Sequence, residues 1–278
     1  MYHRVAQRSA TVVLILREHG ENQVKELIHA GRVAVFFIDE DQRITTKDIG
    51  SKDEIRKWAA FYGAKVYEGA DLNLVSQFRC NGSDGYLNFL DNLLGLRETA
   101  NTSFDYDYEI RLFRSPVAMR EALREKNAVN NKSRMIAGYC YEWITESDPK
   151  GPLYDIELED GFRAKWNFSN TLFAIDEESF DQVGCIHTTQ GLEFDYCGII
   201  IGKDLRYEDG HVITDPSQEA RSDKSSGIRS CKDRALADRL IRNTYKTLLS
   251  RGQKGCYIYC ENAALLEYIS QSLHLEIE

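Results

Sequence analysis

Residues 33–42 of this 278-residue chain read Val-Ala-Val-Phe-Phe-Ile-Asp-Glu-Asp-Gln. The first six residues are all apolar. A strand that is apolar on both faces is typical of a parallel sheet covered by helices on both sides. In open sheets of this kind, ligands bind beyond the carboxyl ends of the strands. Residues 33–38 therefore predict a buried strand, and residues 39–42 are candidates for a binding site.

Helix patterns lie on both sides of this stretch and recur along the chain. Val24 and Leu27 lie on one face of a helix that ends at Gly31. Ser51 and Glu54 have the spacing of a capping box, which predicts the start of a second helix. By similar patterns the sequence predicts helices over 83–94, 115–126, 236–251 and 265–273, strands over 109–113, 134–139, 183–187, 197–201 and 256–260, and a hairpin over 155–167.

This alternation of helices and strands predicts an α/β fold with two mostly parallel sheets, each flanked by helices. Residues 99–108 are polar and irregular, so we place a domain boundary there. The predicted domains are residues 1–105 and 106–278. Residues 203–232 are rich in Asp, Ser, Lys, Arg and Gly, which predicts a mobile surface loop.

The composition excludes several classes of protein. The chain has 35 basic and 44 acidic residues and a formal net charge of −9, which argues against a surface that binds polyanions everywhere but leaves room for a local basic groove. No apolar run approaches the roughly 18 residues of a membrane helix, and from residues 1–8 and the stretch after them we expect no signal peptide. The 7 cysteines form no C-x-x-C pair, so we expect reduced thiols, no metal site and a cytoplasmic protein without membrane contact.

Four polar segments follow predicted strands or end a helix. Residues 39–42 suit either the Mg²⁺-holding end of a nucleotide-binding strand or a solvated loop. Arg79 carries a planar guanidinium that suits a phosphate or a surface carboxylate. Residues 186–194 supply hydroxyls, an amide and a carboxylate, which suit nucleic-acid phosphates and a ribose hydroxyl, whereas a lone histidine at a strand end, such as His187, is more often a structural residue. Arg251 either stabilises the end of its helix or reaches a γ-phosphate as an arginine finger.

A nucleotide site of this kind needs a phosphate-binding loop of the form G-x-x-x-x-G-K-[ST]. The 278 residues contain no such run. Either the protein is not an NTPase, or this sequence lacks the front part of one.

Taken together and in order, the segments resemble the later motifs of superfamily one helicases. They are more closely similar to a bacterial DNA/RNA helicase-like family, long catalogued as a domain of unknown function and related to the helicase-like end of Schlafen proteins. The resemblance is carried by Val35-Phe36-Phe37-Ile38-Asp39-Glu40-Asp41-Gln42-Arg43, Gln77-Phe78-Arg79-Cys80-Asn81-Gly82-Ser83, Ala137-Gly138-Tyr139-Cys140-Tyr141-Glu142-Trp143, residues 187–196 and residues 243–259. It implies the later part of a first RecA-like P-loop NTPase domain, followed by a second RecA-like domain.

The resemblance also implies roles for individual residues at a nucleotide. Gln42 corresponds to the glutamine of the third motif, which senses the γ-phosphate. Arg79 and Arg251 correspond to the arginines of the fourth and sixth motifs. Glu193, with the neighbouring Gly191, is implied to contact the ribose of ATP.

The fifth motif is further implied to contact a nucleic-acid strand through His187, Thr188 and Thr189. The implied partner is single-stranded DNA or RNA, and the implied cofactors of the full-length protein are ATP and Mg²⁺. Because the family's catalytic carboxylates and phosphate loop precede the matching segments, we expect this sequence to be part of a longer protein and to be inactive as an ATPase by itself.

An alternative is a non-catalytic module that keeps a helicase-like fold and binds nucleic acid or protein without turnover. The net charge of −9 favours this alternative, because a strand-binding channel normally has a basic stripe. The presence of both Arg79 and Arg251 in motif context favours the ATPase.

Overall fold

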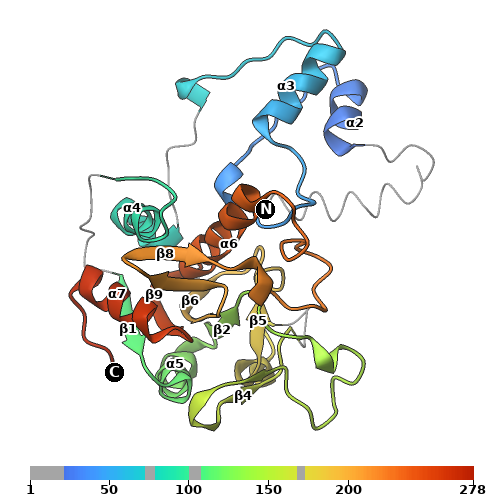
Figure 1. The fold of residues 1–278 in the computed structure, drawn as a ribbon. Helices are drawn as coiled ribbons and strands as arrows, with labels where there is room; N and C mark the ends of the chain where they lie inside the picture. Colours follow the sequence, from blue (N-terminus) through green and yellow to red (C-terminus); the bar gives the residue numbers. More distant parts are fainter. Residues whose placement is uncertain (1–21, 73–78, 100–107, 168–172) are drawn as a thin grey trace. The chain divides into compact units, whose positions relative to one another are not determined.

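The computed structural model describes residues 22–72, 79–99, 108–167 and 173–278 (Figure 1). The chain divides into two compact units. The first unit comprises Met1–Arg43 and Lys47–Ser76, and the second comprises Ile44–Thr46 and Gln77–Glu278. In this division, residues 77–99 belong to the second unit, although they precede the boundary that we predicted near residue 105.

The first unit contains two packed helices, α2 (Gln23–Ala30) and α3 (Lys52–Phe61), and the short 3-10 helices η1 (Glu40–Gln42) and η2 (Ala70–Leu72). The predicted helix starts are confirmed. The side chain of Ser51 accepts a hydrogen bond from the backbone N–H of Glu54 at 3.1 Å, and the Glu54 carboxylate accepts one from the N–H of Gly50 at 2.6 Å. The first contact satisfies an amide group that the first turn of a helix leaves unpaired, and the second holds the chain that leads into the helix.

The strand predicted over residues 33–38 is wrong. These residues form no strand, and Val33 and Val35 are 83% and 72% exposed. A strand needs a neighbouring strand to bond its N–H and C=O groups. The described residues of the first unit contain no strand that supplies one.

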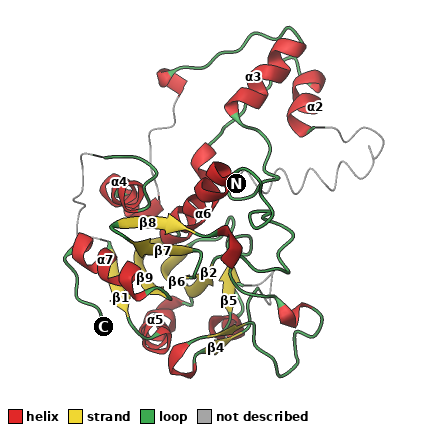
Figure 2. Ribbon diagram, viewed as in Figure 1, coloured by secondary structure: helices red, strands yellow, loops and turns green. Residues whose placement is uncertain are grey.

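The second unit is built on a five-stranded sheet in the order β1-β9-β6-β2-β5 (Figure 2). All neighbouring strands of this sheet are parallel. The strands are β1 (Glu109–Phe113), β2 (Ser133–Ala137), β5 (Val183–Cys185), β6 (Phe194–Ile201) and β9 (Gly252–Cys260). The predicted α/β fold is confirmed, and its parallel sheet flanked by helices is consistent with a RecA-like domain.

Helices cover both faces of this sheet. On one face, α5 (Pro116–Asn130) lies so close that a Cβ atom at Gly198 would be 2.3 Å from Cδ1 of Leu123. Successive residues of a strand point to opposite faces. Cys197 therefore faces the other side, where it interacts with Cys80, just before helix α4 (Asp84–Leu93). Helix α4 packs against α6 (Arg234–Leu249).

The remaining elements complete the second unit. They are α7 (Ala263–Leu273), the 3-10 helices η3 (Arg79–Gly82), η4 (Ile144–Glu146), η5 (Glu159–Gly161), η6 (Glu177–Asp181) and η7 (Pro216–Gln218), and the antiparallel pairs β3 (Ile156–Glu157) with β4 (Arg163–Ala164) and β7 (Leu205–Glu208) with β8 (His211–Thr214). The hairpin predicted around residues 160–161 is confirmed.

The prediction of a mobile loop over residues 203–232 is wrong. The segment contains the β7–β8 hairpin, and it buries Asp204, Glu219 and Ile228 almost completely. The polar composition of this segment gave no sign that Asp204 and Glu219 are buried, because buried polar residues leave no apolar pattern in a sequence. No helix in the described part of the chain is long and apolar enough to cross a membrane.

Candidate functional site

Arg251 and Glu193 lie side by side at the amino end of the sheet. Arg251 directly precedes β9 and Glu193 directly precedes β6. Phe194 and Gly252, the first residues of these two strands, are paired in the parallel register. The backbones of Arg251 and Glu193 are therefore neighbours. Gly191, with φ at 75°, lies in the exposed turn that leads to Glu193.

The turn that carries Arg79 reaches the same end of the sheet. Cys80, the next residue, donates a hydrogen bond from Sγ to the carbonyl oxygen of Ser250 at 3.6 Å. The hydroxyl of Tyr86 donates to the carbonyl oxygen of Leu249 at 3.1 Å. These bonds fix η3 against the chain just before Arg251. The backbone of Arg79 begins η3, and its side chain lies outside the part of the chain that the structure describes.

Arg251 is half-buried immediately beyond the end of α6. Its backbone N–H donates to the carbonyl oxygen of Leu248 at 3.1 Å. Burial raises the pKa of the Cys197 thiol, and the positive charge of Arg251 partly opposes this increase. This position, where the helix dipole favours a cation, is compatible with both roles considered for Arg251.

The hydroxyls of Thr188 and Thr189 point into the protein. Thr188 Oγ1 accepts a hydrogen bond from the N–H of Cys185 and donates one to its carbonyl oxygen, both at 2.7 Å. Thr189 Oγ1 donates to the carbonyl oxygen of Ile186 at 3.1 Å. The two side chains are 6% and 0% exposed. In this structure the two hydroxyls stabilise the turn after β5. A contact with a nucleic-acid strand near them would use other groups of the segment.

His187 lies at the carboxyl end of β5, opposite the end that carries Arg251. It is half-buried, and its Nε2 is 2.8 Å from the hydroxyl of Tyr139. Gln42 lies in η1 of the first unit, where its Nε2 donates to Oδ2 of Asp39 at 2.6 Å. The predicted residues of the second unit thus form two groups, with Arg251, Glu193, Gly191 and the backbone of Arg79 at one end of the sheet and His187 to Thr189 at the other.

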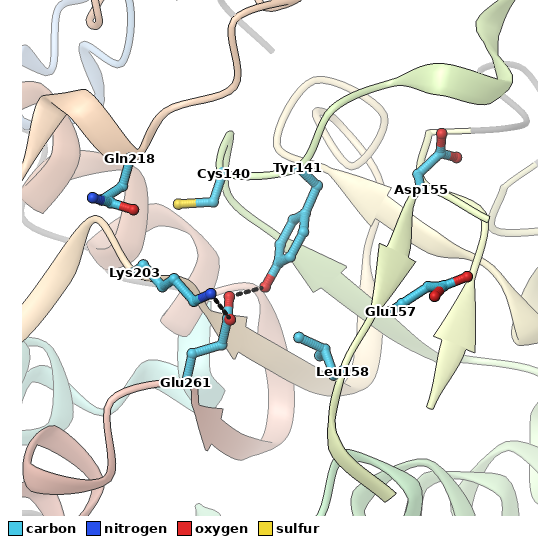
Figure 3. A pocket seen from close by; sticks show the side chains of 8 residues that line it. All are labelled: Cys140, Tyr141, Asp155, Glu157, Leu158, Lys203, Gln218 and Glu261. Atoms are coloured by element: carbon cyan, nitrogen blue, oxygen red, sulfur yellow. Dashed lines mark hydrogen bonds and ion pairs between the residues drawn. The ribbon is translucent and has the colours of Figure 1, made fainter. Parts of the chain in front are cut away.

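A cavity of about 380 Å³ also lies at the carboxyl end of the sheet (Figure 3). Tyr141 follows β2, Lys203 follows β6 and Glu261 follows β9, so three neighbouring strands each contribute a side chain. The hydroxyl of Tyr141 donates to the Glu261 carboxylate at 2.8 Å, and Lys203 Nζ is 3.6 Å from the same carboxylate. The other lining residues are Cys140, Asp155, Glu157, Leu158 and Gln218.

Lys203 and Glu261 are not among the site residues predicted from the sequence. The signal was nevertheless present, because each stands within two residues of the end of a predicted strand, where ligand sites of parallel sheets occur. Only the folded structure shows that Lys203 and Tyr141 both contact the carboxylate of Glu261.

The comparisons with known proteins give the family. A family model described as Schlafen group 3, DNA/RNA helicase domain, matches residues 3–262. The chain belongs to this family. The resemblance found from the ordered motifs is thereby confirmed, and the chain is a helicase-like domain of a kind associated with nucleic-acid interaction.

A relative of this Schlafen helicase domain is the uncharacterized protein YPL245W of Saccharomyces cerevisiae. It is 24% identical over 278 residues, which cover 90% of this chain and 60% of the yeast protein. The chain therefore spans about three fifths of the length of that relative. A comparison with solved structures found no match.

The helicase domain also contains a buried pair of carboxyl groups next to the cavity. Asp204 and Glu219 are each 1% exposed. Asp204 accepts a hydrogen bond from the hydroxyl of Tyr245 and contacts the thiol of Cys140, which lines the cavity. Burial raises the pKa of Asp204, and burial together with the charge of Asp204 raises the pKa of Glu219 well above its usual range.

One proton held between these two carboxyls would stabilise both of them. Within the described residues, Oδ2 of Asp204 and Oε2 of Glu219 accept no hydrogen bond from a permanent donor, yet the two groups interact with each other. One proton between the two oxygens satisfies both, whereas two buried negative charges in contact would be very costly. Cys140 is also protonated, because burial and Asp204 raise the pKa of its thiol well above the usual range.

Two side chains at the amino end of the sheet suit parts of a bound ATP. Arg251 offers a guanidinium for a phosphate, and Glu193 offers an exposed carboxylate for a hydroxyl. Among the described residues, no group of three or more His, Cys, Asp or Glu side chains could hold a metal ion. Among the described residues, these two side chains suit the terminal phosphate and the ribose of a nucleotide.

Proposed function

We propose that this chain forms the phosphate-sensing part of a helicase-like ATPase, which couples ATP hydrolysis to the translocation or unwinding of DNA or RNA. The observation that supports this proposal is the convergence at the amino end of the sheet. Arg251, Glu193 and the turn that begins with Arg79 belong to three segments far apart in the sequence, and they meet there. No single segment would favour a nucleotide site by itself.

In this proposal Arg251 stabilises negative charge on the transferred phosphoryl group. A guanidinium can donate two parallel hydrogen bonds to phosphoryl oxygens, and its charge is permanent at neutral pH. Bound ATP and Mg²⁺ supply the phosphoryl group and its charge neutralisation. The 278 residues contain no phosphate-binding loop, so the proposal requires that another part of the protein hold the β- and γ-phosphates.

ATP turnover tests this proposal. The protein expressed from the natural start of its gene is compared with its Arg251→Ala variant, with and without single-stranded DNA or RNA. We expect strand-stimulated turnover that falls by about 10³-fold in the variant, as for other arginine fingers. Arg124→Ala is the matched control, because Arg124 is an exposed arginine that pairs with Asp181 on the surface. Equal turnover in the Arg251→Ala protein would contradict the proposal.

A second candidate is a non-catalytic module that binds a strand or a protein. It is favoured by the net charge of −9 and by the inward direction of the Thr188 and Thr189 hydroxyls. Salt-dependent binding of single strands without any turnover of ATP would select this candidate.

A further inference from the structure

Four aromatic side chains form a continuous row across the carboxyl ends of β2 and β5. We call Trp143, Trp166, Tyr139 and His187 the aromatic row. The ring centroids of Trp143 and Trp166 are 6.3 Å apart with an interplanar angle of 89°. Those of Trp166 and Tyr139 are 6.5 Å apart at 81°, and those of Tyr139 and His187 are 5.8 Å apart at 56°. The first two contacts are edge-to-face, an arrangement that is favourable for aromatic rings, and the third is tilted.

The two ends of the aromatic row differ from its middle in burial. Tyr139 and Trp166 are 2% and 5% exposed, whereas Trp143 and His187 are half-buried. The middle of the row is therefore part of the core. Its two ends keep part of their surface exposed to solvent.

The backbone around Trp143 is held in place. The N–H of Trp143 donates to Oγ of Ser222 at 3.2 Å, and the N–H of Trp166 donates to Oδ2 of Asp155 at 2.7 Å. The carbonyl oxygen of Tyr139 accepts a hydrogen bond from the N–H of Ala220 at 2.8 Å. A ring supported by a second ring and by fixed backbone loses little freedom when a ligand stacks on it.

We infer that Trp143 is a stacking platform for a base of a single nucleic-acid strand. This inference rests on the proposed function, because that function requires the protein to bind a strand of DNA or RNA. Each base offers a flat π-face to an accessible aromatic ring. The row connects Trp143 with His187, the first residue of the segment that we expect to contact a strand, and the chain belongs to a DNA/RNA helicase domain family.

The charges beside Trp143 are of both signs. The neighbouring Glu142 is exposed, and its carboxylate accepts hydrogen bonds from the backbone N–H groups of Arg221 and Ser222. The hydrogen bond from the Ser222 side chain and the positive charge of Arg221 lower the pKa of this carboxylate, so the charges of Glu142 and Arg221 largely offset each other. Stacking on Trp143 should therefore depend little on salt, unlike the counterion release that accompanies phosphate contacts.

Fluorescence anisotropy with labelled oligo(dT) and oligo(U) tests the inference. Base stacking measured by alanine substitution predicts that Trp143→Ala weakens strand binding about 5- to 150-fold. Trp143→Phe should keep most of the affinity because it keeps a ring. Trp58→Ala is the matched control, since Trp58 is a half-buried tryptophan of α3 in the first unit.

Salt separates stacking from charge in the same experiment. Between about 50 mM and about 200 mM salt the affinity of the unmodified protein should fall, because phosphate contacts elsewhere weaken. The ratio between the affinities of the unmodified protein and Trp143→Ala should stay constant. A ratio that collapses at the higher salt concentration would overturn the stacking role.

A spectroscopic measurement avoids dependence on the alanine variant. With 5-fluorotryptophan incorporated, the 3 tryptophans give separate ¹⁹F resonances, and Trp143→Phe assigns one of them. Addition of an oligonucleotide should shift the Trp143 resonance and leave that of Trp58 in place. An unshifted Trp143 resonance at saturating oligonucleotide would overturn the inference, whether or not Trp143→Ala folds.

The outcomes distinguish this inference from the proposed function. If single strands bind equally well to the Trp143→Ala protein, the stacking role is wrong and the helicase-like ATPase remains. If Trp143→Ala only lowers the melting temperature, Trp143 is a packing residue. If the unmodified protein binds no strand at either salt concentration, both proposals fail.

Discussion

Arg134 and the Asp204–Glu219 pair are buried charged groups of the same sheet, but they lie at opposite ends of it. Arg134, at the amino end of β2, donates hydrogen bonds to carbonyl, amide and hydroxyl oxygens, among them those of Phe173, Asn127 and Ser179. Burial lowers the pKa of Arg134 to about 10, so it remains charged at neutral pH. The carboxyl pair has fewer donors than oxygens, and its charge depends on a shared proton.

This difference shows how a protein can bury charge in two ways. A guanidinium has five N–H donors and can be satisfied by neutral acceptors alone. A carboxylate needs donors, and where the fold supplies too few of them a proton takes their place. The charge at one end of the sheet is therefore fixed near neutral pH, whereas the charge at the other end depends on the protonation of the carboxyl pair.

The largest expected effect is that of Arg134→Met on stability. The substitution removes the guanidinium hydrogen bonds from several buried oxygens, including the carbonyl oxygens of Ser133 and Asp176. We expect the free energy of unfolding to decrease by about 3 kcal/mol or more, measured by urea denaturation. Arg124→Met, at an exposed position on α5, should change it by less than about 0.5 kcal/mol. Similar values for the two variants would show that Arg134 is not a buried structural charge.

An intermediate effect is expected for Asp204→Asn on the pH dependence of stability. Because the folded-state pKa values of Asp204 and Glu219 are raised, the folded protein binds protons more tightly than the unfolded chain. This contribution is fully present below the unfolded-state pKa of about 4 and is lost as the pH rises through the folded-state pKa values. The free energy of unfolding should therefore fall with rising pH, by at most about 1.4 kcal/mol per pH unit for one proton.

Asparagine at position 204 can donate to Glu219 without a shared proton, so the slope should become flatter. The other groups that face the pair are Cys140, Tyr141, Tyr245, Asp223 and Arg229, and they remain unchanged. Urea denaturation at several pH values measures the slope. Asp181→Asn, which alters an exposed carboxylate, is the control. An identical slope for the Asp204→Asn protein and the unmodified protein would contradict the shared proton.

The smallest effect is expected for Lys203→Ala at the cavity. Lys203 is 66% exposed and 3.6 Å from Glu261, so solvent screens their interaction. The free energy of unfolding should change by less than about 1 kcal/mol. ATP turnover by the full-length protein should remain within about twofold, because Lys203 lies at the opposite end of the sheet from Arg251. A large loss of turnover would place the nucleotide at the cavity instead.

The sequence predicts the second unit well, because its signals are local. Ser83 and Ser115 cap their helices as expected. The runs that form β6 and β9 are apolar because both of their faces are covered. For residues 33–38 the same local signal fails, since strand formation depends on a neighbour that the local pattern does not contain.

The candidate site was only partly predicted, because motifs are local in the sequence whereas the proximity of their residues depends on the fold. Arg251 and Glu193 were identified from their motifs, but their proximity depends on the β6–β9 register. The inward hydroxyls of Thr188 and Thr189 could not be foreseen, because a threonine in a motif looks the same whether it bonds a ligand or its own turn. The interaction of Asp204 with Glu219 could not be predicted either, because these residues are distant in the sequence and meet only in the folded core.

Residues 186–193 begin where β5 ends and finish where β6 begins, so they cross from the carboxyl end of the sheet to its amino end. The first half of this segment is fixed by the hydroxyls of Thr188 and Thr189. His187 and Glu193 are close in the sequence, yet they lie at opposite ends of the sheet. A short segment that is anchored at both ends has little slack. Under the proposed function, it would link the nucleotide end of the domain to the end that contacts the nucleic-acid strand.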